Sequence, residues 1–388
     1  MTFVPQNRVL FVLIAGAIAA CLLTGFVSEA PNRLISGRPL TLLQVSPPLT
    51  MLAMIALGLA LVFLAFWPQS QRTRGATIVV AGALLLFMMF DAGRIASALM
   101  KGAPPATRIG LGPGFWVALF CLAMIIIDAL QRLRPSTVFR FVVLALIARP
   151  SAVMLSLGSF SQLSLLREYA SRRDVFTAEL IRHGVLVLAS SSAALLIGMP
   201  LGLWVARKPS AGGAVFSTLN LLQTIPSIAL FGILIVPLSA LAGAFPPLGA
   251  IGIGGIGPAP AMLALVLYAL LPVARDTQAG ITGVEPAVID AAKGLGFTPT
   301  QIFWCVELPL GLPVFLAGLR IMLVQTIGLA VVAALIGAGG LGTFVFQGIG
   351  QYATDLVLLG AIPAILLALA ADFLVTLITA ALTERPTP

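Results

Sequence analysis

Long apolar runs separated by short polar segments recur along the whole chain. A helix needs about 20 apolar residues to cross the hydrocarbon core of a bilayer, and most of the runs approach this length. Because 60% of the 388 residues are hydrophobic and only 9% are charged, the chain is not an ordinary soluble globular protein. We expect an all-α polytopic membrane protein with about ten transmembrane helices. The expected spans are Val9–Val27, Leu49–Trp67, Thr77–Ala98, Phe115–Leu130, Phe139–Phe160, Val185–Val205, Val215–Leu241, Pro260–Val273, Val314–Ile336 and Leu356–Ala381.

The spans fall into two groups on either side of a charged segment. The first group holds about five spans, of which Phe139–Phe160 is the least well defined because Arg149-Pro150 interrupts it. The segment Leu163–Arg182 combines mixed charge with regular apolar positions, which is typical of a helix at the membrane surface. We therefore expect an N-terminal transmembrane bundle at residues 1–160, an extramembrane or interfacial helical linker at 161–182, and a transport core at 183–388.

The basic residues indicate an orientation in the membrane. With Arg8 in the cytoplasm, ten spans place most basic residues of the short loops, and Arg385 near the other end, on the cytoplasmic side. The cluster Arg167–Arg182 is an exception. We expect a multi-pass protein of the bacterial cytoplasmic (inner) membrane with both termini in the cytoplasm. The formal net charge of +9 then reflects anionic lipid, and no nucleic-acid partner is expected.

The chain lacks the residue patterns of catalytic, cofactor and metal sites. It has three cysteines without a C-x-x-C pair and a single histidine, His183, which excludes paired-histidine metal sites. No phosphate-binding G-x-x-x-x-G-K motif is present. Two G-x-G-x-x-G segments, at 252–257 and 337–342, lie between membrane helices and lack the strand that a dinucleotide site requires. We expect no enzymatic activity and no bound cofactor.

A polar segment at residues 285–313 concentrates charge between two apolar runs. It carries Glu285, Asp290, Lys293 and Glu307. A polar insert of this size cannot lie in hydrocarbon, so it must project from the membrane into water.

Small residues predict the local structure of this segment. Ala291-Ala292 favours a short helix that can nest closely in a groove of a partner. Gly294 and Gly296 can supply a turn. Thr298-Pro299 then provides the N-cap and first residue of a second short helix. We expect Leu308-Pro309 to end that helix and to start the next span.

The spacing within this segment follows a recognisable pattern. Asp290-Ala291-Ala292 is followed after three residues by Gly296, and after nine more by Val306-x-Leu308-Pro309. This resembles the EAA loop (E-A-A, three residues, G, nine residues, I-x-L-P) of binding-protein-dependent ABC importer permeases, with Asp in place of Glu and Val in place of Ile. The resemblance implies that residues 285–309, here called the coupling loop, contact a nucleotide-binding subunit. The implied contact residues are Asp290, Ala291, Ala292, Lys293, Gly294, Gly296, Val306, Leu308 and Pro309.

Two further runs, Gln223–Leu230 and Ile336–Gly342, resemble the glycine betaine/choline (osmoprotectant) permeases of the MetI-like superfamily. The resemblance implies a type I importer core, preceded here by an extra helical bundle, that translocates glycine betaine or a related quaternary-ammonium osmolyte. The implied partners are cytoplasmic ABC ATPase subunits that hold ATP and Mg, an external (periplasmic) substrate-binding protein, and a second permease copy or paralogue.

Polar residues inside the expected spans mark a candidate pathway. Gln223, Thr224, Pro226 and Ser227 lie within Val215–Leu241, whereas Arg320 and Asp372 lie in the last two spans. Such groups must face protein, each other or the interface. The main alternative is an ion-coupled secondary transporter, a class that usually shows inverted repeats with matching broken helices. We find no convincing repeat between residues 1–160 and 180–382.

Overall fold

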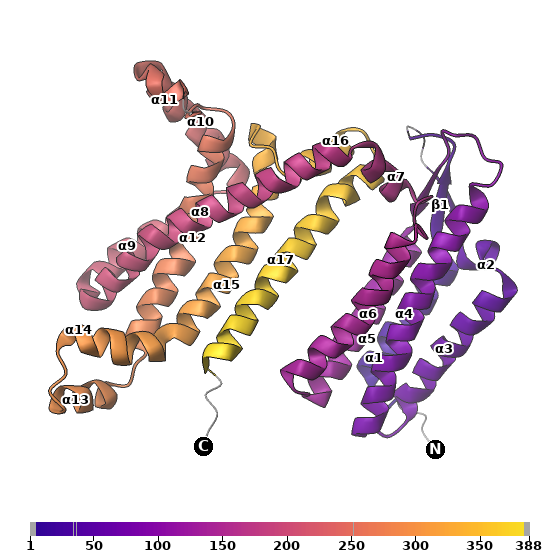
Figure 1. Ribbon diagram of the computed structural model, residues 1–388, viewed down its shortest axis with the longest axis horizontal. Coiled ribbons are helices and arrows are strands. Elements are labelled where there is room, and N and C mark those ends of the chain that lie inside the picture. The colour runs from indigo at the N-terminus through magenta and orange to yellow at the C-terminus, as the bar shows by residue number, and fades with distance from the viewer. Residues whose placement is uncertain (1–4, 34, 36, 251, 384–388) are drawn as a thin grey trace. The chain divides into compact units, whose positions relative to one another are not determined.

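The computed structural model describes residues 5–33, 35, 37–250 and 252–383, so Arg385 lies outside the described residues. The chain divides into two compact units, Met1–Ser171 (unit 1) and Arg172–Pro388 (unit 2) (Figure 1). Within the described residues, nine helices are long and apolar enough to cross a membrane, and Arg8–Leu23 is a shorter apolar helix. The expected all-α membrane architecture is therefore confirmed.

Unit 1 is a bundle of apolar helices around one core. Leu10, Ile14, Leu61, Leu122 and Ile125 are buried at its centre. The helices are α1 (Arg8–Leu23), α2 (Leu42–Val45), α3 (Pro48–Phe66), α4 (Gln71–Leu99), α5 (Pro113–Leu133), α6 (Thr137–Ser156) and α7 (Ser164–Ser171).

A small sheet, which the apolar pattern did not predict, closes one end of unit 1. Its order is β2 (Arg38–Leu40), β1 (Val27–Ala30), β3 (Arg108–Leu111), with both pairs antiparallel and Val27 opposite Leu40 and Leu111. The expected helix Val9–Val27 is therefore too long, because the chain becomes extended at Thr24 and enters β1. Glycine permits the close approach there: a Cβ at Gly112 would lie 2.1 Å from the Gly25 carbonyl oxygen.

The expected interruption of the fifth span is wrong. Helix α6 runs from Thr137 to Ser156 with Pro150 inside it. A proline removes one helix hydrogen bond and crowds the preceding turn, but membrane helices tolerate it where the freed backbone group finds another partner.

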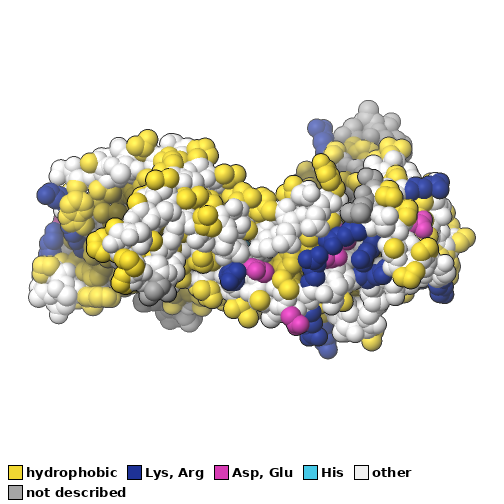
Figure 2. Space-filling view, turned by 90° about the horizontal axis from the view of Figure 1, so that it is seen from above, with side chains coloured by type: hydrophobic (Ala, Val, Ile, Leu, Met, Phe, Trp, Pro, Cys, Tyr) yellow, Lys and Arg dark blue, Asp and Glu magenta, His cyan; other side chains and the backbone are white. Residues whose placement is uncertain are grey.

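The single helix expected at Leu163–Arg182 is also wrong, because the chain forms α7 up to Ser171 and starts α8 at Arg173. Side chains of α7 bind within unit 1. Arg167 donates to the carbonyls of Thr107 (2.8 Å) and Pro105 (2.9 Å), and Glu168 pairs with Arg33 at 3.2 Å. Figure 2 shows Lys and Arg gathered on this sheet-bearing face of unit 1. These contacts fix α7 to unit 1 and explain part of the basic cluster.

Unit 2 is built from long helices around α12 (Pro258–Thr282), the most buried span of the described residues. Figure 1 places α13 and α14 at one end of this unit and α16 at the opposite end. The remaining elements are α8 (Arg173–Arg207), α9 (Pro209–Thr224), α10 (Ser227–Ala244), α11 (Pro246–Ala250), α13 (Pro286–Gly294), α14 (Pro299–Ile302), the π-helical turn η1 (Phe303–Glu307), α15 (Leu308–Val332), the 3₁₀ turn η2 (Ala333–Ile336), α16 (Gly342–Gly350) and α17 (Thr354–Thr383).

Small residues let the central helices of unit 2 approach closely. A Cβ at Gly202 of α8 would lie 2.4 Å from the carbonyl oxygen of Ala274 in α12. Between α12 and α15, a Cβ at Gly311 would lie 2.5 Å from the Gly280 carbonyl oxygen. This is the small-residue packing that membrane helices use in place of a hydrophobic driving force.

The expected span Val215–Leu241 is wrong, because the chain breaks it into α9 and α10. Pro226 has no N–H to donate, and the preceding Ile225 is extended (φ −70°, ψ 125°), as a residue before proline tends to be. Of the two helices, only α10 qualifies as a span by length and apolar character.

Candidate coupling site

The first helix of the coupling loop presents a polar face outward. Pro286 occupies its first position, and Asp290 and Lys293 form an i, i+3 ion pair at 3.0 Å. The side chains of both are mostly exposed, at 72% and 61%. Ala291 is exposed too, whereas Ala292 is buried. Helix α13 is therefore anchored on one side and open on the other.

The turn expected at Gly296 is present. Gly296 has φ +84°, the left-handed conformation that glycine adopts without steric cost. The Gly296 N–H donates to the Lys293 carbonyl oxygen at 2.9 Å, and the N–H of the next residue, Phe297, donates to the Ala292 carbonyl oxygen at 3.1 Å. Gly294, in contrast, is the last helical residue of α13. One glycine, rather than two, makes the turn.

The second short helix begins as predicted. The Thr298 hydroxyl accepts a hydrogen bond from the Gln301 N–H at 3.3 Å, and the Gln301 side-chain oxygen accepts one from the Thr298 N–H at 2.8 Å. This capping box, with Pro299 at the first helical position, fixes where the helix starts.

The end of α14 differs from the prediction, because Leu308-Pro309 does not terminate the helix. The chain continues through the π-helical turn η1 directly into α15. The Leu308 N–H donates to the Phe303 carbonyl five residues back. Val306 is half-buried in this turn, and Pro309 is exposed. The elements α14, η1 and α15 therefore form one continuous helical segment.

An ion pair that sequence reasoning missed joins this turn to α8. Both oxygens of the Glu307 carboxylate accept hydrogen bonds from Arg207, one of them at 2.8 Å. The Glu307 side chain is only 7% exposed, whereas that of Arg207 is 51% exposed. A signal existed in the sequence: a lone acid stands at the start of one span, and an arginine ends another span on the same expected side.

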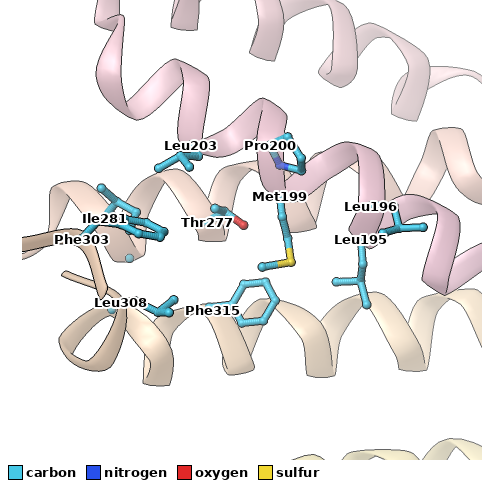
Figure 3. A pocket seen from close by; sticks show the side chains of 12 residues that line it. Leu195, Leu196, Met199, Pro200, Leu203, Thr277, Ile281, Phe303, Leu308 and Phe315 are labelled. Carbon is cyan, nitrogen blue, oxygen red and sulfur yellow. The ribbon is translucent and has the colours of Figure 1, made fainter. Parts of the chain in front are cut away.

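Two cavities meet beside this pair. The larger one, of about 800 Å³, is lined by residues that include the charged Arg207, Lys293 and Glu307. The apolar one, of about 380 Å³, lies between α8, α12 and the start of α15, and Met199, Thr277 and Phe315 point into it (Figure 3). Both cavities are lined by Leu203 and Phe303. Gly280 and Gly311 also line the apolar cavity, so their close contact forms part of its wall.

The candidate pathway residues form two separate arrangements. Gln223 donates to the Tyr268 carbonyl at 2.9 Å, and the Tyr268 hydroxyl donates to Ile225 at the break between α9 and α10. The hydroxyl of Thr224 donates to its own helix, at the Leu221 carbonyl, while Pro226 and Ser227 form the break and the start of α10. These polar residues thus stabilise a discontinuous helix.

Arg320 and Asp372 pair with each other across α15 and α17. Two hydrogen bonds join them, one of 2.9 Å from an Arg320 guanidinium nitrogen to the Asp372 carboxylate. Their side chains are 49% and 32% exposed. Each charge therefore has its counter-ion inside the chain.

The apolar spans, the glycine-packed core and the two-helix loop together define a polytopic transport permease. Residues 198–384 match the family described as the binding-protein-dependent transport system inner membrane component. Residues 6–166 match the N-terminal domain of the ABC transporter permease YehY. The chain belongs to the binding-protein-dependent ABC importer permeases.

This chain matches most of the length of its named relatives. The osmoprotectant import permease protein OsmW of Salmonella typhimurium is 38% identical over 204 residues, which are 53% of this chain and 90% of the relative. The carnitine transport permease protein OpuCB of Listeria monocytogenes is 36% identical over 192 residues, 50% of this chain and 81% of the relative. Among solved structures, the inward-facing MetNI methionine ABC transporter has a TM-score of 0.48 at 24% identity, covering 55% of this chain and 99% of that one.

Proposed function

We propose that this chain is the membrane subunit of an ATP-driven importer, in which ATP and Mg are held by separate cytoplasmic ATPase subunits. The observation that carries the proposal is the coupling loop. Its α13 exposes Asp290, Ala291 and Lys293 on one face while Ala292 anchors the other. A short helix that keeps one face open at the end of a membrane core, with the small Ala291 on that face, can approach a groove of a partner protein closely.

The continuous helix formed by α14, η1 and α15 can carry a movement of the coupling loop into the membrane core. Closure of two ATPase subunits around ATP displaces the coupling loops of two permease copies or paralogues. Because α14, η1 and α15 form one helix, α15 moves with the loop, and α12 follows at the Gly280–Gly311 contact. In this proposal the loop and both termini face the cytoplasm, and the chain itself carries out no chemical step.

The proposed cargo is glycine betaine or a related quaternary-ammonium osmolyte delivered by an external, periplasmic binding protein. Support comes from the names of the relatives, which include osmoprotectant, carnitine, choline and glycine betaine permeases. Carnitine, choline and glycine betaine share a trimethylammonium group. Arg320 and Asp372 are paired with each other, so neither offers the cargo an unpaired charge. This arrangement fits a cargo whose recognition does not require a free charge inside the membrane.

Co-purification tests the ATPase contact. The tagged chain is isolated from its native membrane as wild type, as Asp290→Arg plus Gly296→Trp, and as the control Asp174→Arg plus Gly249→Trp. The control makes the same two changes at exposed positions outside the coupling loop. We expect an ATPase subunit with the wild type and the control but not with the loop variant. Absence of any ATPase from the wild type, together with uptake that survives ATP depletion, would favour the ion-coupled transporter.

A further inference from the structure

Glu307 is a buried carboxylate at the point where the coupling loop enters the membrane core. A carboxylate that is only 7% exposed needs a partner, because desolvation of an isolated charge is costly. Arg207 is that partner and donates two hydrogen bonds to the Glu307 carboxylate. In this two-bond geometry the guanidinium and carboxylate groups neutralise each other's charge and also hold each other in position.

The π-helical turn sets the direction of the Glu307 side chain. An α-helix advances by about 100° per residue, so the extra residue accommodated in η1 rotates the following side chains by about that amount relative to α14. Single π-helical turns of this kind are frequent at functional sites. Here the turn ends at Glu307, whose carboxylate reaches α8.

Helix α8 connects the two ends of unit 2. It has 35 residues, which corresponds to a length of about 52 Å. Arg207 is its last residue, and near its other end Glu179 accepts a hydrogen bond from the N–H of Gly340. The glycine turn around Gly340 is packed directly on α8, since a Cβ at Gly340 would lie 3.1 Å from a ring nitrogen of His183. A displacement of α8 as one rigid body would therefore move both Arg207 and the contact with this turn.

An apolar cavity separates part of α8 from the start of α15, close to Leu203 and Leu308. Figure 3 shows Met199 of α8 and Phe315 of α15 pointing into the space between their helices. Packed helices shift as rigid bodies rather than deforming continuously. The hydrogen bonds between Arg207 and Glu307 therefore determine whether α8 moves together with the start of α15.

From these contacts we propose that Arg207 and Glu307 are a positioning pair, which carries the movement of the coupling loop into α8 and so to the glycine turn at residues 337–342. The inference rests on the proposed function, because the loop moves only if an ATPase drives it. Arg207 and Glu307 would contact neither cargo nor nucleotide; they would act through α8.

The test separates positioning from simple neutralisation of a buried charge. The variants are Arg207→Met, Arg207→Lys, Arg207→Met plus Glu307→Gln, and the control Lys208→Gln at the adjacent exposed residue. Each is reconstituted in vesicles with the ATPase and the binding protein, and glycine betaine uptake is measured per ATP hydrolysed, together with ATPase co-purification.

We expect the double neutral variant to fold and to capture the ATPase, because no buried charge is left unpaired, yet to lose at least tenfold in uptake per ATP. Arg207→Lys should retain part of the uptake, and Lys208→Gln should equal the wild type. Wild-type uptake by the double neutral variant would overturn the inference, since neutralisation alone would then suffice. Failure of the wild type to capture an ATPase would instead refute the proposed function.

Discussion

The Arg320–Asp372 pair permits a quantitative prediction, because Arg320 lies near the middle of the long apolar span Pro299–Ile336. It is 21 residues after Pro299 and 16 residues before Ile336. A hydrocarbon core about 30 Å thick that is centred on this span would hold the pair near its middle. One uncompensated charge at the centre of a membrane helix costs about 2.5–3.5 kcal/mol on the insertion scale. Because both side chains are partly open, we take the lower value, about 2.5 kcal/mol, or roughly sixtyfold in the unfolding equilibrium.

The assay is reversible unfolding in bicelles of Asp372→Asn, Arg320→Met and the double variant, with Arg275→Met as control. Arg275 is exposed and makes weak contacts, a 3.3 Å hydrogen bond to Asn220 and a cation–π contact 5.6 Å from the Phe216 ring, so its replacement should cost about 1 kcal/mol. Each single change at the pair should lower the free energy of unfolding by about 2.5 kcal/mol. The double variant should lose less than either single variant, because it leaves no unpaired charge.

Additivity would refute this reasoning. If the double variant loses the sum of the two single losses, the charges do not interact energetically in the membrane. The hydrogen bonds between Arg320 and Asp372 would then contribute nothing to stability.

Three further changes have expected outcomes. Gly202→Leu should destabilise unit 2 by about 1–3 kcal/mol through overpacking. Gly184→Leu is the control, because a Cβ at Gly184 would have nothing within 4 Å, and this variant should fold normally. Thermal unfolding distinguishes the two variants. Tyr268→Phe should cost about 0.5–1.5 kcal/mol by removing the hydrogen bond at the α9–α10 break, and an unchanged midpoint would contradict that role. Gly296→Val forces a β-branched residue to φ +84° and should weaken ATPase capture, while Gly213→Ala, at a position with open space inside α9 and outside the coupling loop, should not.

Local patterns in the sequence predicted local structure well. The apolar runs predicted most of the spans, and the chemistry of Gly296 and Thr298-Pro299 predicted the turn and capped helix of the coupling loop. These features depend on residues within one or two turns of each other. The break at Pro226 was visible in the same way, but the apolar residues on both sides favoured one continuous span.

The features that were not predicted depend on residues far apart in the chain. Glu307 binds Arg207 one hundred residues away, and β1 pairs with a strand about 80 residues later. The separation of α7 from α8 depends on Arg33 and on carbonyls of the loop at 105–107. No local periodicity encodes such contacts, because each is decided by the packing of the folded unit.

The central claim is that ATP hydrolysis on a partner drives uptake through this chain by way of the coupling loop. The most direct measurement is uptake of radiolabelled glycine betaine into vesicles that contain the chain, its ATPase and the external binding protein, with ATP present or absent. The account predicts uptake that requires ATP and the binding protein and is lost in Asp290→Arg plus Gly296→Trp. Uptake driven by an ion gradient without ATP, and unaffected by those two substitutions, would contradict it.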